Sequence, residues 1–131
     1  LGRYDYISAV LRVKSNMDSG MFYGIQQGAI VALNLSKDWY TAINTIYAKR
    51  RKIVWAILDK LNCSYDKNSG GMFVWAKLPK GVSTDEIVDD LLYNKNIFIT
   101  PGTIFGSKGE GYIRLSLCVK EDQLNEALNR L

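Results

Sequence analysis

The segment Gly111-Tyr112-Ile113-Arg114-Leu115-Ser116-Leu117 alternates polar and apolar side chains with the period of a β-strand. Its isoleucine and two leucines are expected on one face of a sheet, and Arg114 lies at the centre of the other face. A guanidinium in this position is permanently charged, and its planar donors match the two oxygens of a carboxylate. The pattern alone fits two interpretations: an arginine on the solvated face of an antiparallel sheet, or an arginine that binds a carboxylate.

The segments around this strand alternate between strand and helix patterns. A strand led by two glycines is predicted over residues 72–78, and a helix is predicted to start at the capping box Ser83-x-x-Glu86. A second short strand follows at 97–100, and a final helix runs to Leu131. The second half of the chain is therefore expected to form a small sheet with helices packed on it.

The first half of the chain is predicted to be helical. A short helix follows Asp5, a polar break occupies residues 14–20, and a second helix covers 22–33. A third helix over residues 37–61 has about 24 residues and would reach about 36 Å, which suits an element that spans two domains. The whole pattern predicts an α+β fold: a sheet of about three to four strands flanked by helices and preceded by helices, including one long interdomain helix.

Composition excludes several classes of function. The 131 residues suffice for one compact domain, and 47% hydrophobic with 23% charged residues is typical of a globular protein. The net charge of +4 is mild, and the basic run at 49–52 lies inside a predicted helix, which favours a solvated helix surface over a nucleic-acid footprint. Because histidine is absent, Ser-His and Cys-His nucleophilic machinery is excluded from this chain.

The two cysteines, Cys63 and Cys118, are far apart in the sequence and have no histidine partner, so we expect no metal site. Two buried, reduced thiols in a cytoplasmic protein are the simplest interpretation. The longest apolar stretches, such as residues 28–35, are too short to span a bilayer. We therefore expect a cytoplasmic protein with neither a nucleic-acid nor a membrane partner.

Four segments, in this order, resemble the carboxy-terminal part of fold-type-I aminotransferases that depend on pyridoxal phosphate, in the branch of the aspartate and LL-diaminopimelate aminotransferases. They are Lys14-Ser15-Asn16-Met17-Asp18-Ser19-Gly20-Met21-Phe22, Gly70-Gly71-Met72-Phe73-Val74-Trp75, Pro101-Gly102 through Phe105-Gly106, and Tyr112-Ile113-Arg114-Leu115-Ser116. The resemblance covers essentially the whole chain. It implies the small carboxy-terminal domain of a homodimeric enzyme of amino-acid metabolism.

The resemblance also implies roles for individual residues. Arg114 corresponds to the arginine that grips the α-carboxylate of the amino-acid or 2-oxo-acid substrate. Ser15 and Asn16 lie in a stretch that borders the active site, often that of the neighbouring subunit. A second interpretation stays open for this stretch, because Ser and Asp before a helix are ordinary capping residues. No catalytic residue, cofactor ligand or metal ligand is expected in this chain.

One departure from the family concerns the lysine that forms the Schiff base with pyridoxal phosphate, which lies just upstream of the point matching Leu1-Gly2. We therefore expect residues 1–36 to be the end of an absent large domain and residues 37–131 to be the small carboxy-terminal domain. The cofactor is expected in the full-length enzyme and not on this chain, which alone should be inactive.

The resemblance thus predicts the substrate-carboxylate-binding part of an aminotransferase. Two alternatives remain at this stage. One is a lyase or decarboxylase of the same fold type, because these enzymes share the carboxylate arginine. The other is a stand-alone module that binds a small molecule.

Overall fold

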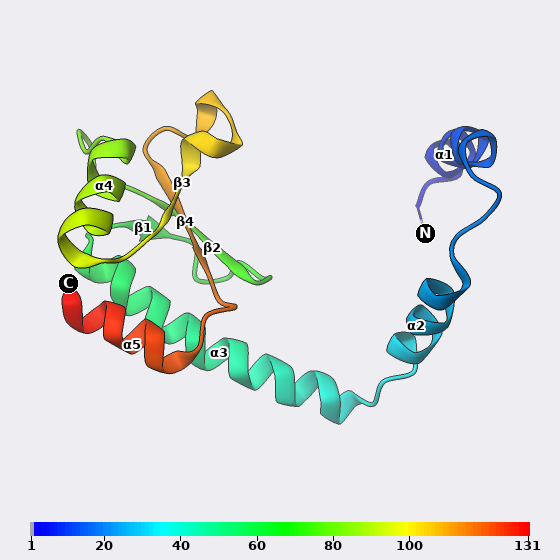
Figure 1. Ribbon diagram of the computed structural model, residues 1–131, viewed down its shortest axis with the longest axis horizontal. Coiled ribbons are helices and arrows are strands. Elements are labelled where there is room, and N and C mark those ends of the chain that lie inside the picture. The colour runs from blue at the N-terminus through cyan, green and yellow to red at the C-terminus, as the bar shows by residue number, and fades with distance from the viewer. Residues whose placement is uncertain (1) are drawn as a thin grey trace. The chain divides into compact units, whose positions relative to one another are not determined.

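The computed structural model describes residues 2–131, which form two compact units divided between Tyr40 and Thr41 (Figure 1). The first unit contains helices α1 (Tyr4–Met17) and α2 (Tyr23–Leu33). Helix α3 (Lys37–Lys60) begins in the first unit and continues through the second. The remaining elements are β1 (Ser64–Tyr65), β2 (Phe73–Lys77), α4 (Thr84–Lys95), β3 (Thr100–Pro101), the 3-10 turns η1 (Gly102–Phe105) and η2 (Ser107–Gly109), β4 (Tyr112–Ser116) and α5 (Glu121–Arg130).

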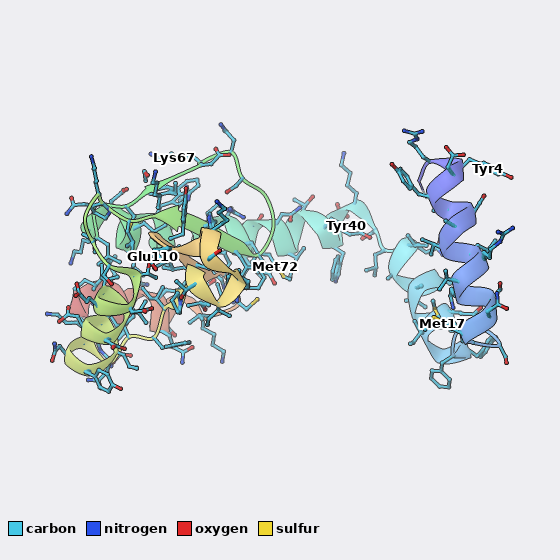
Figure 2. The ribbon with its side chains drawn as sticks, turned by 90° about the horizontal axis from the view of Figure 1, so that it is seen from above. Tyr4, Met17, Tyr40, Lys67, Met72 and Glu110 are labelled. Atoms are coloured by element: carbon cyan, nitrogen blue, oxygen red, sulfur yellow. The ribbon has the colours of Figure 1, made fainter. Side chains whose placement is uncertain are left out.

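Helix α1 is longer than its sequence predicts. A polar break was expected to start at residue 14, but the helix continues to Met17, and Figure 2 shows Tyr4 and Met17 at its two ends. The polar side chains are satisfied within the helix: the Oγ of Ser15 and the Nδ2 of Asn16 both donate to the carbonyl of Arg12. A helix can thus continue through polar residues when the carbonyl groups of the helix accept hydrogen bonds from their side chains.

Helix α3 confirms the prediction of one long helix, and it is unbroken through the basic run at 49–52. Its start is capped by Ser36, whose Oγ accepts a hydrogen bond from the N–H of Trp39 at 3.3 Å. Asp38 in the first turn and Lys60 in the last turn both complement the helix dipole. Only Val54, Ile57 and Leu58 of this helix are buried.

The sheet of the described residues has four antiparallel strands in the order β1-β2-β4-β3. The α+β fold with a sheet of this size is confirmed. Strand β4, which contains Arg114, is central and pairs with β2 on one side and β3 on the other. Arg114 stands opposite Trp75 of β2 and Thr100 of β3.

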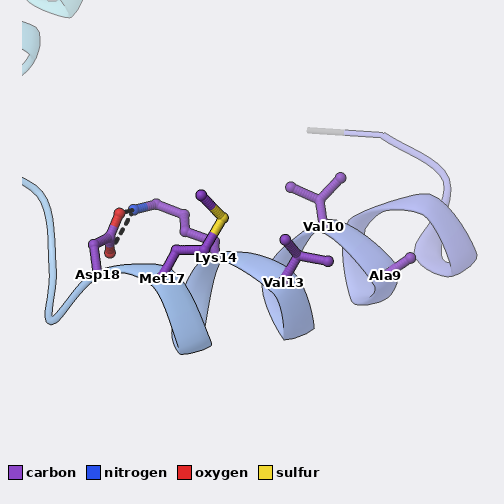
Figure 3. Close-up of a pocket in the computed structure, with 6 residues that line it drawn as sticks. All are labelled: Ala9, Val10, Val13, Lys14, Met17 and Asp18. Carbon is purple, nitrogen blue, oxygen red and sulfur yellow. Dashed lines mark hydrogen bonds and ion pairs between the residues drawn. The ribbon is translucent and has the colours of Figure 1, made fainter.

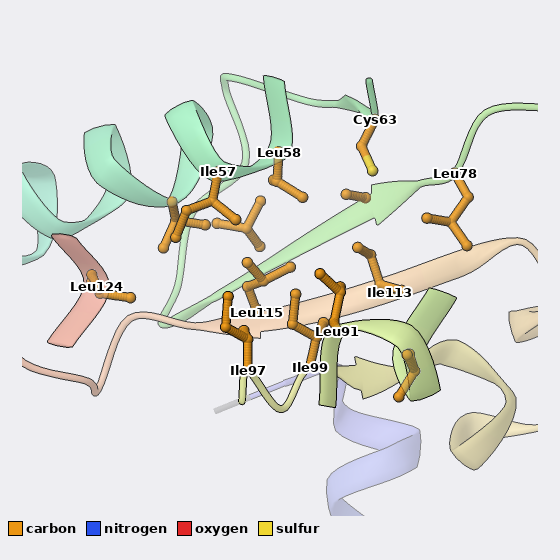
Figure 4. Packing of buried hydrophobic residues seen from close by; sticks show 14 of the residues in the cluster. Ile57, Leu58, Cys63, Leu78, Leu91, Ile97, Ile99, Ile113, Leu115 and Leu124 are labelled. Carbon is orange, nitrogen blue, oxygen red and sulfur yellow. The ribbon is translucent and has the colours of Figure 1, made fainter. Parts of the chain in front are cut away.

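One face of the sheet carries the hydrophobic core, which it shares with α3, α4 and α5 (Figure 4). Full burial of a Val, Leu or Ile side chain contributes about 1.5–3 kcal/mol to stability. The core is formed by Val54, Ile57, Leu58, Cys63, Val74, Ala76, Leu78, Val88, Leu91, Ile97, Ile99, Ile113, Leu115, Leu117 and Leu124. Every member belongs to the second unit, and neither α1 nor α2 has a buried residue.

Helix α4 confirms the predicted capping box, because the Oγ of Ser83 accepts from the N–H of Glu86. The helix ends at Lys95, and the C-cap residue Asn96 adopts the left-handed conformation with φ of 54°. The strand expected at residues 97–100 was wrong in its extent, since β3 is only Thr100–Pro101. The N–H of Ile97 donates to the carbonyl of Leu91 instead of joining a ladder, so the chain reaches β4 only at Thr100.

Helix α5 lies beside α3 and runs in the same direction (Figure 1). The Nε of Arg50 donates to Glu121 at 2.8 Å, and the Nζ of Lys60 donates to the carbonyl of Leu128. The hydrogen bond from Arg50 lowers the pKa of the Glu121 carboxyl. These contacts fix both ends of α5 against the long helix.

The two cysteines differ in burial. Cys63 is buried as expected, but the expectation for Cys118 was wrong: it is exposed, because the chain leaves the sheet directly after Leu117. Within residues 2–131, no helix combines the length and the apolar composition needed to cross a bilayer.

Candidate functional site

Within the described part of the second unit, α3, α4 and α5 pack on the core face of the sheet, and the other face carries the candidate binding residues. Along β2, the odd-numbered residues from Phe73 to Lys77 are exposed while the residues between them are buried. Along β4, Arg114 is half-buried between the fully buried Ile113 and the buried Leu115. The alternation predicted for the Arg114 strand is therefore confirmed. It places Arg114 in the middle of the exposed face.

Two aromatic rings surround the guanidinium of Arg114. Its Cζ lies 4.3 Å from the centroid of the Phe73 ring and 4.5 Å from that of the Phe105 ring. Both distances are well inside the range of a cation–π interaction. The Nε of Arg114 is buried, and no described residue accepts a hydrogen bond from it. A buried donor without a partner is rare in native proteins and marks a group that a ligand or water can satisfy.

Phe105 belongs to the loop between β3 and β4, and a close contact between two glycines shapes this loop. A Cβ built on Gly102 would lie 2.2 Å from the carbonyl oxygen of Gly109, and one on Gly109 would lie 1.9 Å from that of Gly102. No other residue type fits these two positions without moving the backbone. Because neither glycine carries a Cβ, the two turns η1 and η2 can approach this closely, with Gly106 at a φ of 116° between them.

The aromatic contacts continue across the face. The Trp75 ring meets the Phe105 ring edge-on at 5.7 Å and stacks on Tyr112 at 5.5 Å. The Nζ of Lys77 lies 5.9 Å from the Tyr112 ring. Arg114 is therefore one end of a continuous aromatic surface, and Lys77 is a second cation at its other end.

Arg51 of α3 fixes the start of β2 and hence the position of Phe73. Its two terminal nitrogens donate to the carbonyls of Ser69 and Gly71, at 2.9 and 2.5 Å. Met72, labelled in Figure 2, lies between Gly71 and Phe73. The glycine-led turn is thus bound to the long helix.

A second network fixes the start of β4. Thr84, which is fully buried at the start of α4, donates through its N–H and its Oγ to the carboxylate of Glu110. The same Oγ accepts from the N–H of Gly111 at 2.7 Å. The carboxylate at the first turn of α4 also complements the helix dipole. Both strands that flank the candidate site are therefore anchored independently of any ligand.

A cavity of about 290 Å³ opens beside Arg114, where β3 is too short to cover β4. Thr100, Arg114, Ser116 and Gln123 supply its polar groups, and the rest of its lining is apolar. The cavity is large enough for a small organic acid, and Arg114 is the one cationic side chain in its lining. The arrangement can hold a carboxylate, and its lining contains no lysine, cysteine or acidic side chain that could act as a base.

Ser15 and Asn16, the other predicted site residues, lie in the last turn of α1, in the first unit. Both are exposed, and both donate to the same carbonyl of Arg12. They do not cap α2, whose N-cap is Phe22 without a side-chain hydrogen bond. Their role in substrate binding stays a prediction.

A hollow of about 510 Å³ lies along α1, and Figure 3 shows the residues that line it. It is lined by Ala9, Val10, Val13, Lys14, Met17 and Asp18. Lys14 and Asp18 form an ion pair at 2.6 Å, which lowers the pKa of Asp18 through the hydrogen bond from Lys14. The hollow offers apolar contact and no unpaired reactive group, so we assign it no chemistry.

The sequence predicts Arg114, and the family resemblance implies that residues 104–109 position it, but neither predicts the contacts of the Phe73 and Phe105 rings with its guanidinium. Phe73 could have been found, because the period of two along 72–78 puts it on the same face as Lys77. Phe105 could not have been found from periodicity, because its position depends on the contact between Gly102 and Gly109.

Comparison with known proteins identifies relatives along the whole chain. Residues 1–131 match the family described as aminotransferase class I and II. The chain is 38% identical over 131 residues to the LL-diaminopimelate aminotransferase of Maridesulfovibrio salexigens. Among solved structures, an aminotransferase from Staphylococcus aureus is 30% identical with a TM-score of 0.81, and a probable N-succinyldiaminopimelate aminotransferase from Thermus thermophilus is 27% identical with a TM-score of 0.84.

These similarities involve only part of each relative. The matched region covers all of this chain but 34% of the Maridesulfovibrio protein. For each of the two solved structures, it covers 99% of this chain and 35% of the other. The chain therefore spans about a third of the length of the relatives that it matches.

Proposed function

Since this chain belongs to the aminotransferase class I and II family, we propose that it forms the substrate-carboxylate-binding part of an enzyme that depends on pyridoxal phosphate. The enzyme would transfer an amino group between an amino acid and a 2-oxo acid. On this proposal, Arg114 binds the α-carboxylate that donor and acceptor have in common.

The observation that carries this proposal is the environment of Arg114. The guanidinium touches two aromatic rings, and its buried Nε lacks an acceptor among residues 2–131. The remaining N–H donors of this guanidinium lie in one plane, and a carboxylate can accept hydrogen bonds from two of them at once. Fixing two atoms of the substrate restricts its orientation, which is the main contribution that a protein makes beside an organic cofactor.

The described residues do not fit the covalent anchor of pyridoxal phosphate. No described lysine is buried, and several are already engaged: Lys14 pairs with Asp18, Lys60 donates to Leu128 and Lys77 lies over Tyr112. We therefore derive no chemical step through the cofactor. On this proposal its anchor lies in another part of the enzyme, and the present chain alone does not transaminate.

The proposal extends to the arrangement of domains. Residues 1–36 would belong to a large domain and residues 37–131 to the small carboxy-terminal domain of a cytoplasmic homodimer. The division between compact units at Tyr40 lies four residues from this boundary, inside α3. Ser15 and Asn16 would then border an active site, with their exposed side chains available to a ligand or a second subunit.

The names of the relatives indicate which donors to test first. LL-diaminopimelate and N-succinyldiaminopimelate both carry an α-amino-acid group, which Arg114 would bind through its carboxylate. We propose diaminopimelate-type amino acids as the first donors to assay.

Steady-state kinetics of the enzyme that contains this chain test the proposal. Arg114→Ala should leave folding intact, because the residue is only half-buried and lies outside the core. Loss of a charge-assisted pair in a closed site costs about 3 to 5 kcal/mol. We therefore expect kcat/KM to fall by about two to four powers of ten. Arg114→Lys should recover only part of the loss, because an ammonium does not reproduce the planar fork.

Arg130→Ala provides the control. Arg130 is exposed on α5 and pairs with Glu126, so its loss should change kcat/KM by less than about twofold. If Arg114→Ala had an equally small effect, Arg114 would be a solvated sheet residue and the proposed substrate-binding role would be wrong.

A further inference from the structure

We infer that Phe105 is a positioning residue for the carboxylate site, and that the glycine contact at its base exists to hold its ring against Arg114. This inference rests on the proposed function of Arg114 and goes beyond it. The affinity of the site then depends on an aromatic ring that need not touch the substrate.

Phe105 does not behave as a core residue. It is 53% exposed and lies outside the buried cluster. Its ring nevertheless lies 4.5 Å from the Cζ of Arg114 and 5.7 Å from the Trp75 ring. Burial in the core therefore does not explain why a large apolar side chain takes this position.

The loop backbone supplies the explanation. Gly102 and Gly109 are both buried, and each carbonyl occupies the space that a Cβ on the other would need. A Cβ on Gly102 would also lie 2.7 Å from the carbonyl oxygen of Tyr112, at the start of β4. The turn that carries Phe105 is thus joined to the strand that carries Arg114. The close approach of the backbones sets how near the turn with Phe105 lies to the strand with Arg114.

The effect on Arg114 follows from the charge distribution of the ring. The negative face of a phenyl ring attracts a cation, and the attraction grows when water is excluded. Rings in contact with the guanidinium limit its rotation and leave its in-plane donors for a ligand. A carboxylate then meets a cation that is already oriented, so less side-chain entropy is lost on binding.

Phe105 can be separated experimentally from Phe73. Phe73 is part of the ladder between β2 and β4, opposite Ser116, so its substitution also perturbs the sheet. Phe105 makes no ladder contact and lies at the end of η1. Its substitution therefore tests the ring contact with little effect on the sheet.

The first experiment compares Phe105→Leu with Phe105→Trp in the enzyme that contains this chain. Leucine keeps an apolar side chain but has no π-system, whereas tryptophan restores one. We expect Phe105→Leu to raise KM for the amino-acid donor by about three- to tenfold, the effect of one partly exposed cation–π contact. The kcat should stay within about twofold, because uniform binding is lost and no reacting group is touched. Phe105→Trp should return KM to within about twofold of the parent value.

Ile104→Ala is the matched control, because it removes three side-chain carbons from the neighbouring, exposed position of the same loop, as Phe105→Leu does. It should leave KM unchanged. The inference is overturned if Phe105→Leu leaves KM unchanged, if Ile104→Ala raises KM equally, or if the leucine and tryptophan variants behave alike. If Arg114→Ala itself has no effect, the proposed function fails, whatever the result at Phe105.

A second measurement needs no turnover. In the 131-residue chain, the Nε–H resonance of Arg114 can be followed by NMR while propionate, a simple carboxylate, is added. We expect a saturable shift in the parent chain and a dissociation constant about three- to tenfold higher in Phe105→Leu. An identical dissociation constant in both chains would refute the role of the ring.

Discussion

Arg114 differs from other arginines of the second unit in what its guanidinium contacts. Arg50 and Arg51 donate to backbone carbonyls at the ends of strands, and Arg130 donates to the carbonyl of Asn96. Those three charges stabilise the fold. Arg50 also lies over a ring, 5.8 Å from the centroid of Tyr47, but its charge is paired with Glu121. Arg114 lies over two rings, which attract its charge but accept no in-plane hydrogen bond, so the charge stays available to a ligand.

The two cysteines allow a prediction at the same scale. Burial raises the pKa of the Cys63 thiol to about 11, whereas Cys118 is exposed. The thiolate is the reactive form, and a raised pKa lowers its fraction at every pH below that value. At pH 8, a disulfide reagent such as dithionitrobenzoate should react quickly with one thiol of the native chain. The second thiol should react only after unfolding in guanidinium.

Cys118→Ser identifies the reactive thiol. This variant should lose the fast reaction of the native chain and keep the reaction that follows unfolding in guanidinium. Two fast phases of equal amplitude in the native parent chain would show that Cys63 is accessible. The assigned core position of Cys63 would then be wrong.

At the scale of elements, the sequence predicts what depends on periodicity and capping. The exposed and buried faces of β4, the unbroken α3 and the Ser83 cap all follow from local patterns and are confirmed. The two-residue strand β1 and the shortened β3 do not follow from them, because their extent depends on which backbone groups find partners in the folded chain. The contact between Gly102 and Gly109 is likewise tertiary, since two glycines seven residues apart carry no local signal of their meeting.

This contact gives a prediction about stability. Gly102→Ala should lower the free energy of unfolding by about 3 kcal/mol, the upper end of the usual cost of overpacking, because its Cβ would meet backbone and no flexible side chain could move away. For a unit of this size, the Tm in a thermal melt should fall by more than about 10 °C.

Gly70→Ala is the matched control in the same unit, since a Cβ at Gly70 meets nothing within 4 Å. It should change the Tm by less than about 3 °C, as a surface substitution of up to about 0.5 kcal/mol would. If the two variants had the same Tm, the loop would open without loss of stability. Phe105 would then have no fixed position.

At the scale of the whole molecule, the two units differ in how they are stabilised. The second unit has a continuous core. Side-chain hydrogen bonds also join α3 to α5 and to the glycine-led turn before β2. Helices α1 and α2 bury no residue, although α2 is rich in apolar side chains. The helical pattern of residues 1–36 was predictable from sequence, but the surface that these helices cover was not, because periodicity shows an apolar face and not its partner.

The last prediction concerns that apolar surface. Val10, Val13 and Met17 are each more than half exposed on α1, as are Ile25 and Val31 on α2. Apolar patches of this kind promote association in water. The 131-residue chain should therefore self-associate at high concentration, and sedimentation velocity should show an average mass that rises with concentration. A dye that fluoresces on apolar surfaces should bind to it.

The double variant Val10→Glu, Val13→Glu tests the cause, because two carboxylates on one face of α1 repel each other across a contact between copies and are costly to bury. Its sedimentation coefficient should be lower and independent of concentration, while the Tm of the second unit stays unchanged. A parent chain that sediments as a compact monomer at every concentration and binds no dye would contradict the prediction. The exposed side chains of α1 and α2 would then be covered within the chain itself, and residues 1–36 would need no further surface to bury them.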